Sequence, residues 1–240
     1  MLKSKTSSRT RMQPQDRVDS ILAHTAELVI HEGVTAVTID RVSQLANVSR
    51  SLIYNYFKDT NEILISLFKL VRKNFREEQT KTVAKTRSFE DLIRLTTRNT
   101  LRYYLENGDL IVRLTNEPAI ANGVLETEEE KNWLKEVENY YSKQLMDRYN
   151  IPRDIALTVF QVQQGLAESA GVRCVKRLGE DGFEFLEELI YTANMASLRA
   201  LGRKYGESDQ EIVLDDAWIG DAQAILTDLS KLVELNKNKP

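Results

Sequence analysis

The sequence predicts an all-α protein, and three of its properties lead to this prediction. Only ten of the 240 residues are glycine and four are proline, the two residues that most often interrupt helices. Apolar residues recur three and four positions apart over long stretches, which is the spacing of one face of an α-helix. Hydrophobic residues make up 42% and charged residues 29%, as in ordinary globular proteins. This length allows one large domain or two small ones.

The first two helices have clear boundary signals. Apolar residues at helical spacing predict a helix from about residue 15 to residue 32, and Gly33 follows where a glycine C-cap is favoured. Thr38 is a good N-cap for a short second helix that ends near Leu45. Asn47 then falls in a tight turn. Asparagine tolerates the left-handed conformation that such a turn requires better than other non-glycine residues.

Two more helices complete the N-terminal region. Ser49 is placed to cap a third helix over residues 50–56, and Thr60 or Asn61 to cap a fourth over residues 62–81. Five apolar residues are expected to form the core that holds the second and third helices at a fixed angle: Val42, Leu45, Val48, Ile53 and Phe57.

The sequence after residue 81 predicts longer helices, which are separated by residues that end one helix and allow the next to begin. Ser88 opens one of them, with an acidic residue three positions later as in a capping box. Helices are expected over residues 88–106, 127–149, 152–178, 183–205 and from about residue 222, with breaks at 107–108, 117–118, 151–152 and 179–182.

The net charge of −3 is unevenly distributed along the chain. Residues 1–17 hold five basic residues against one acidic residue, so the N-terminal end is basic while the body is acidic. We interpret residues 1–14 as a basic disordered arm that reaches phosphate groups. A solubilising tail without a binding role is the alternative.

Several functional classes receive no support. No apolar run approaches the roughly eighteen residues of a membrane span, and no apolar signal region is present, so a cytoplasmic protein is expected. The single cysteine, Cys174, agrees with a reducing compartment. His24 and His31 are too far apart to share a metal ion, and no phosphate loop or catalytic triad pattern is present. We expect no enzyme, catalytic residue, metal or cofactor.

The second and third helices have the sequence pattern of a helix-turn-helix motif that binds in the DNA major groove. Arg50 can donate two hydrogen bonds to guanine, which is worth about 1–3 kcal/mol of discrimination between bases. Ser51 can donate or accept, and Leu52 can contact a thymine methyl group. Hydroxyl groups at the flanks of such a helix bind phosphate and set its register rather than read bases.

This segment resembles the DNA-binding domain of TetR-family transcriptional regulators over about residues 15–68. Matching positions include the glycine after the first helix, the threonine that opens the second, and the aromatic ending of the third. The positions in register are Gly33, Thr38, Ser43, Val48, Ser49, Tyr54, Tyr56 and Phe57.

The resemblance implies that Thr38, Tyr54 and Tyr56 contact phosphate. One departure is that Thr60 stands where the family commonly has a lysine, and Lys58 is a candidate to supply the missing charge. The predicted DNA-binding residues are Thr38, Ser49, Arg50, Ser51, Leu52, Tyr54, Tyr56 and Lys58.

The resemblance also implies that residues 69–240 form a helical ligand-sensing and dimerisation domain, with a homodimer through about residues 152–205. Residues 183–205 are apolar on more than one face, which favours a second partner. A fully buried central helix in a monomer is the alternative. Aromatic and amide side chains are candidates for an effector pocket: Asn99, Tyr103, Trp133, Tyr140, Tyr141, Phe160 and Gln164.

We therefore predict a nucleoid-associated, DNA-binding transcriptional regulator. Specifically, we expect a dimeric repressor that a small-molecule effector releases from a pseudo-palindromic double-stranded DNA operator. One alternative is an effector-independent nucleoid or cell-division factor on the same scaffold. Another is a helical adaptor that no longer binds DNA, for which Thr60 in place of lysine is the supporting feature.

Overall fold

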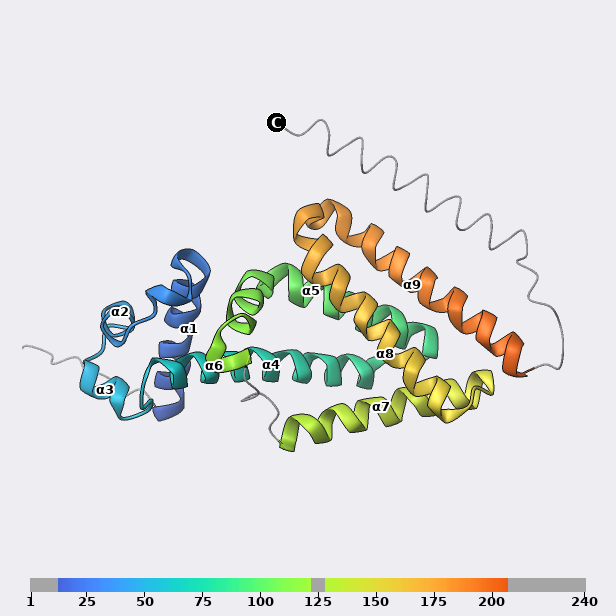
Figure 1. The fold of residues 1–240 in the computed structure, drawn as a ribbon, viewed down its shortest axis with the longest axis horizontal. Coiled ribbons are helices and arrows are strands. Elements are labelled where there is room, and N and C mark those ends of the chain that lie inside the picture. Colours follow the sequence, from blue (N-terminus) through green and yellow to red (C-terminus); the bar gives the residue numbers. More distant parts are fainter. Residues whose placement is uncertain (1–12, 122–127, 207–240) are drawn as a thin grey trace, which may run out of the picture. The chain divides into compact units, whose positions relative to one another are not determined.

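The computed structural model describes residues 13–121 and 128–206, and throughout these ranges its regular elements are helices (Figure 1). The all-α prediction is confirmed. The described residues form two compact units, one of residues 13–72 with 109–121 and the other of residues 73–108 with 128–206. The predicted basic arm, apart from its last residues, and the predicted last helix lie outside the described residues.

The first unit begins with α1 (Pro14–Glu32), the short helix η1 (Val34–Ala36), α2 (Ile39–Leu45) and α3 (Arg50–Tyr54). It also holds the first half of α4 (Thr60–Lys85), the end of α5 (Phe89–Thr115) and α6 (Pro118–Ala121). α1 packs against α2, which packs against α3. The core of this unit is apolar and buried, and includes Ile21, Leu22, Leu28, Val29, Val42, Ile53, Phe57, Ile63, Leu64 and Leu67.

The boundary signals of α1 and α2 act as predicted. Gly33 adopts φ 93°, and its N–H donates to the carbonyl of Val29 at 3.1 Å, which ends α1. The hydroxyl of Thr38 accepts a hydrogen bond from the N–H of Arg41 at 3.2 Å and so caps α2. Asn47 has the left-handed φ of 51° expected for the turn.

Leu45 is not part of the core, contrary to the prediction. It is 43% exposed, whereas Val42, one turn earlier, is fully buried. Leu45 is the last residue of α2, and the chain turns away immediately after it. Leu45 therefore has no neighbouring element to cover it, although helical spacing places it close to the side of the buried Val42.

The start of α4 also differs from the prediction. Asp59, rather than Thr60 or Asn61, supplies the cap, because its carboxylate accepts a hydrogen bond from the N–H of Glu62 at 2.9 Å. The carboxylate of Glu62 in turn accepts from the N–H of Lys58. This reciprocal pair satisfies two N–H groups that the helix itself leaves without partners.

The second unit contains α7 (Glu128–Tyr149), α8 (Arg153–Ala170) and α9 (Lys176–Gly206), together with the end of α4 and most of α5. α7 packs against α8 and α9 (Figure 1). A buried apolar cluster joins these helices to α5 and consists of Phe89, Leu92, Ile93, Tyr141, Leu145, Ile151, Ala156, Phe160, Met195 and Leu198.

α5 continues through Asn107 and Gly108, where the sequence predicts a break. A glycine inside a helix costs only about 1 kcal/mol. The side-chain amide of Asn107 donates to the carbonyl of Tyr103 at 3.2 Å, and Leu110 and Leu114 bury themselves in the next turns. Burial of two leucines outweighs the local preference for a turn.

The predicted helix over residues 152–178 is interrupted. α8 ends at Ala170, and Gly171–Val175 follow in π-helical geometry as η2. A Cβ atom at Gly171 would lie 2.4 Å from Cδ2 of Tyr104, so the glycine permits close packing of η2 against α5. The predicted break at residues 179–182 is present at Gly179, whose φ of 66° and ψ of −162° are not helical.

Candidate functional site

The N-terminus of α3 is organised by two serines. The hydroxyl of Ser49 accepts from the N–H of Leu52 at 3.2 Å, as expected for a cap, and lies 2.9 Å from the hydroxyl of Ser51. α3 ends at Tyr54, two residues earlier than predicted, so Tyr56 lies in the turn before α4. Ile53 is fully buried and anchors the inner side of this helix.

The outer side of α3 is exposed. Arg50, Ser51 and Tyr54 are exposed, and Tyr54 is open to solvent over 57% of its surface. Leu52 and Tyr56 are half-buried. An exposed aromatic hydroxyl beside a guanidinium and a serine can donate hydrogen bonds to both base edges and phosphates.

Arg50 does not extend freely from α3. Its Nε lies 2.6 Å from Oδ1 of Asp40 in the first turn of α2. The side chain of Arg50 is 65% exposed and that of Asp40 is 50% exposed. The ion pair therefore contributes little to stability. Its effect is to orient the guanidinium relative to the two helices.

Thr38 precedes α2 and Lys58 follows α3 in the sequence, so these two residues flank the exposed side of α3. Thr38 is exposed while it caps α2, and its hydroxyl has a second lone pair for another partner. Lys58 is exposed in the turn before α4, and its backbone N–H is held by Glu62. All eight predicted DNA-binding residues therefore lie within α2, α3 and their immediate flanks.

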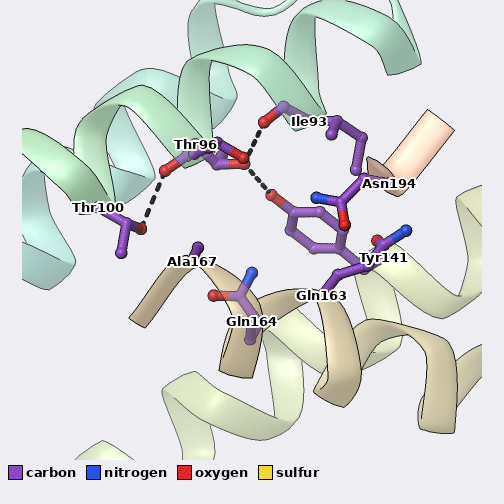
Figure 2. A pocket seen from close by; sticks show the side chains of 9 residues that line it. Ile93, Thr96, Thr100, Tyr141, Gln163, Gln164, Ala167 and Asn194 are labelled. Atoms are coloured by element: carbon purple, nitrogen blue, oxygen red, sulfur yellow. Dashed lines mark hydrogen bonds between the residues drawn. The ribbon is translucent and has the colours of Figure 1, made fainter. Parts of the chain in front are cut away.

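A small cavity lies in the second unit between α5, α7, α8 and α9 (Figure 2). Its volume of about 10 Å³ leaves room for about one water molecule. The residues that line it are mostly polar and uncharged: Ile93, Thr96, Thr97, Thr100, Tyr141, Gln163, Gln164, Ala167 and Asn194.

Hydrogen bonds fix one wall of this cavity. The hydroxyl of Tyr141 donates to Oγ1 of Thr96 at 2.9 Å, and Oγ1 of Thr100 donates to the carbonyl of Thr96 at 3.0 Å (Figure 2). Burial holds the pKa of the Tyr141 hydroxyl well above its ordinary value, so this group stays neutral. In contrast, Nε2 of Gln163 is buried and has no hydrogen-bond partner in the structure.

Tyr141 and Gln164 are the predicted ligand residues that line the cavity. Phe160 is buried beside it, with its ring centroid 4.9 Å from that of Tyr141. Asn99 is half-buried, and its Nδ2 atom is unpaired.

The other three predicted ligand residues lie elsewhere. The ring of Tyr103 packs against Phe75, with 4.4 Å between centroids, and Nε1 of Trp133 donates to Oγ1 of Thr80 at 3.4 Å. Tyr140 is 41% exposed and does not face inward.

Five polar residues that line the cavity were not predicted from the sequence, namely Thr96, Thr97, Thr100, Gln163 and Asn194. One signal was available. Three threonines within five residues place small hydroxyl groups on the face of α5 that also carries the buried Ile93. Polar residues on an otherwise apolar helix face indicate a hydrogen-bonded interior.

No group of three or more histidine, cysteine or acidic side chains is arranged to hold a metal ion within the described ranges. No helix of residues 13–121 and 128–206 has the length and apolar character needed to span a membrane.

Comparisons with known proteins agree with this geometry. The model of the tetR family of bacterial regulatory proteins matches residues 21–67, which cover most of α1, all of α2 and α3 and the start of α4. No curated protein matches the sequence.

Solved structures show the same fold over most of the chain. The fatty acid degradation regulator FadR from Bacillus halodurans shares 15% identity with a TM-score of 0.58, over 79% of this chain and 99% of that chain. A TetR-like transcriptional regulator from Rhodococcus sp. RHA1 shares 12% identity with a TM-score of 0.59, over 79% and 99%. FadR from Bacillus subtilis, solved with stearoyl-CoA, shares 17% identity with a TM-score of 0.53, over 72% and 97%.

The predicted resemblance is confirmed by both kinds of comparison. Residues 21–67 are a TetR-family helix-turn-helix DNA-binding domain, in a chain that has the fold of TetR-family transcriptional regulators.

Proposed function

We propose that this protein is a dimeric repressor that binds a pseudo-palindromic operator through α3 and is released by a small molecule bound in its second unit. The observation that carries the proposal is the division of α3 into two sides. Ile53 is fully buried, whereas Arg50 and Tyr54 are exposed on a helix whose N-terminus is capped. A recognition helix needs this combination of a fixed inner side and an exposed polar outer side.

The surface of α8 supports a second copy of the chain as partner. Val162, Leu166 and the following Val172 of η2 are 66%, 41% and 46% exposed. Val162 and Leu166 are four residues apart and lie on the same side of α8. Gly165 between them leaves open space around its Cα, which allows close approach of another helix. A two-fold partner also matches the two half-sites of a pseudo-palindrome.

The cavity in the second unit supports an effector site. It contains an unpaired buried amide at Gln163 and is framed by α5, which continues into the first unit. A ligand that changes the position of α5 can therefore act on the DNA-binding unit. Coupling of this kind is typically worth about 1–3 kcal/mol.

A binding titration tests the proposal. Fluorescence anisotropy with a labelled palindrome from the region upstream of its own gene should show tight binding that weakens steeply with salt. Addition of a small-molecule extract of the source cells should release the DNA. Arg50→Ala should lose preference among bases, whereas Tyr54→Phe should weaken binding to every sequence alike. Equal loss on every sequence for Arg50→Ala would contradict the assignment of base reading to Arg50.

Sedimentation of the same protein tests the dimer. Val162→Glu and Leu166→Glu place charges on the proposed interface and should shift the protein toward a monomer with weaker operator binding. Gln161→Glu, at an exposed position whose side chain points to α7 on another side of α8, is the matched control for an added charge. A wild-type protein that sediments as a monomer at all concentrations would refute the dimer.

The small size of the cavity favours one second candidate, an effector-independent DNA-binding factor on the same scaffold. This candidate predicts that no fraction of the extract releases DNA. It also predicts many dispersed binding sites in a genome-wide footprint, whereas a repressor with one operator predicts few.

A further inference from the structure

The chemistry of the cavity wall limits which class of ligand the proposed effector site can bind. Gln163 is only 7% exposed, lines the cavity and has an Nε2 group without a partner. An amide N–H group that is buried without a partner costs stability, because it has given up its hydrogen bond to water. A ligand that accepts a hydrogen bond from Nε2 recovers this cost.

The wall holds no charge that could pair with an ionic ligand. None of the nine lining residues within the described part of the chain is acidic or basic. The titratable group among them, Tyr141, stays neutral because burial raises the pKa of its hydroxyl. A charged group buried here would lose its hydration without gaining an opposite charge, which is strongly unfavourable.

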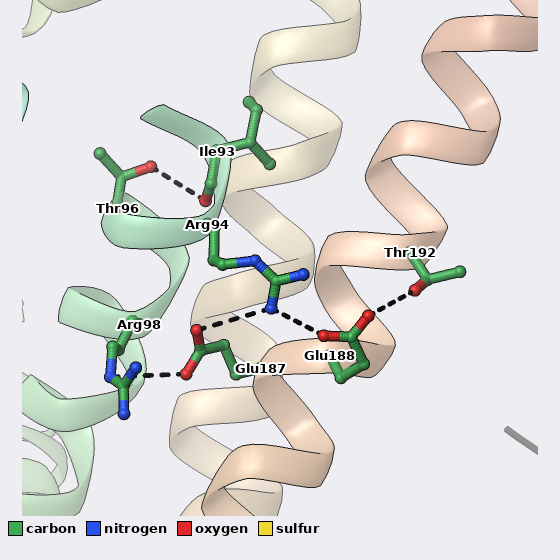
Figure 3. A network of polar contacts seen from close by, with 7 residues as sticks. All are labelled: Ile93, Arg94, Thr96, Arg98, Glu187, Glu188 and Thr192. Atoms are coloured by element: carbon green, nitrogen blue, oxygen red, sulfur yellow. Dashed lines mark hydrogen bonds and ion pairs between the residues drawn. The ribbon is translucent and has the colours of Figure 1, made fainter. Parts of the chain in front are cut away.

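The arginines on α5 beside the cavity are already engaged with α9 (Figure 3). Nη1 of Arg94 lies 2.7 Å from Glu188 and 3.9 Å from Glu187, and Nε of Arg98 lies 3.5 Å from Glu187. The ring of Tyr191 also lies 3.9 Å from the guanidinium carbon of Arg94. A phosphate or carboxylate ligand would have to compete with these carboxylates for its partners.

We infer that the cavity binds a compact, uncharged molecule that accepts a hydrogen bond from Nε2 of Gln163, rather than an anionic ligand such as an acyl-CoA. This inference rests on the proposed effector site and names its ligand class. The space of about 10 Å³ means that entry requires movement of the flexible amide side chains of Gln163 and Gln164. Ligands of a few heavy atoms require the least such movement.

Ligand-observed ¹⁹F NMR with two small probes of similar shape tests the inference. Trifluoroacetamide is neutral and trifluoroacetate is anionic, and both have a carbonyl oxygen. The full-length wild-type protein should increase the transverse relaxation rate of trifluoroacetamide and leave that of trifluoroacetate near its free value. Gln163→Leu and Gln163→Met should abolish the effect on trifluoroacetamide.

Gln161→Leu is the matched control, since Gln161 is exposed on the same helix and donates to Glu138 instead. It should preserve the trifluoroacetamide response. Circular dichroism should show that every variant keeps the helical fold. The inference is overturned if trifluoroacetate binds as well as trifluoroacetamide, if neither probe binds, or if stearoyl-CoA displaces trifluoroacetamide.

The NMR measurement involves no DNA. A protein that binds trifluoroacetamide through Gln163 but is never released from DNA by an extract would refute the proposed regulation and keep the ligand class. A protein that an anionic metabolite releases from DNA would keep the regulation and refute the ligand class.

Discussion

Asp40 in the first turn of α2 holds Arg50 at the start of α3, with 2.6 Å between Oδ1 and Nε. The two residues belong to different helices of the same motif, so their ion pair connects the angle between α2 and α3 to the direction of the guanidinium. A guanidinium has five N–H donors, and the ion-pair contact at Nε leaves the four N–H groups of the two Nη atoms for other partners. Asp40 is therefore a positioning residue for the proposed reader of bases.

Asp40→Asn should reduce discrimination between bases without reducing affinity for non-specific DNA. The variant loses the group that orients Arg50, but it also removes a negative charge beside the DNA. Competition titrations with operators altered at one base pair should show a smaller penalty for the altered pair. Arg50→Ala sets the limit, a loss of about 1–3 kcal/mol of discrimination at that pair. Unchanged discrimination in Asp40→Asn would show that Arg50 needs no support.

The turn between α2 and α3 should tolerate glycine better than alanine at position 47. Asn47 has a φ of 51°, where residues with a Cβ other than asparagine or aspartate are strained. Asn47→Ala should lower the free energy of unfolding by about 1 kcal/mol, and Asn47→Gly should be roughly neutral. Chemical denaturation of both variants measures the difference. Equal stability of the two would mean that the turn changes its conformation.

Gln163→Leu should stabilise the protein in the absence of ligand. The amide is buried with Nε2 unpaired, and removal of an unpaired buried polar group recovers about 1–3 kcal/mol. Leucine has a similar volume and suits the neighbouring Ala167 and Ile93, which also line the cavity. Thermal unfolding of the purified variant should show a higher Tm than wild type. A lower Tm would indicate that Gln163 makes a stabilising hydrogen bond in solution.

Glu187 should give the protein a distinct pH dependence of stability. Burial raises the pKa of its carboxyl above the ordinary value of 4.5, and Arg98 and Arg94 oppose this shift. A raised pKa means that the folded protein holds the proton more tightly than the unfolded chain. The resulting stabilisation is complete below pH 4.5 and is lost as pH rises through the pKa of the folded state.

The isosteric variant Glu187→Gln removes this titration. The free energy of unfolding of wild type relative to the variant should therefore fall as pH rises from about 4 to about 7. Urea denaturation at a series of pH values measures both proteins. A constant difference across this range would mean that the folded and unfolded states bind this proton equally.

Local signals were sufficient for the DNA-binding unit. The caps at Thr38 and Ser49 and the left-handed turn at Asn47 are properties of a few adjacent residues, and each is present where the sequence predicts it. The exposed position of Leu45 and the cap by Asp59 were not predicted. Whether the last residue of a helix is buried depends on neighbouring elements, which the local sequence does not show. The cap was expected at Thr60 or Asn61, but the adjacent Asp59 also has a side chain suited to capping.

Long-range packing decided the second unit. α5 passes through Asn107 and Gly108 because distant residues cover its next turns, and π-helical geometry at Gly171 accompanies contact with Tyr104. The cavity collects residues from four helices that are up to about a hundred positions apart in sequence. Helical periodicity identifies which face of each helix is buried, but not which buried faces meet.

The sequence by itself determined that this chain is helical, that its N-terminal segment is a helix-turn-helix, and which side chains lie on the exposed side of α3. These properties depend on contacts within a few turns of one another. The tertiary structure decided that Arg50 is paired with Asp40, that Gln163 rather than Tyr103 faces the cavity, and that the cavity is uncharged. Each of these depends on how separate helices pack, which requires the folded chain.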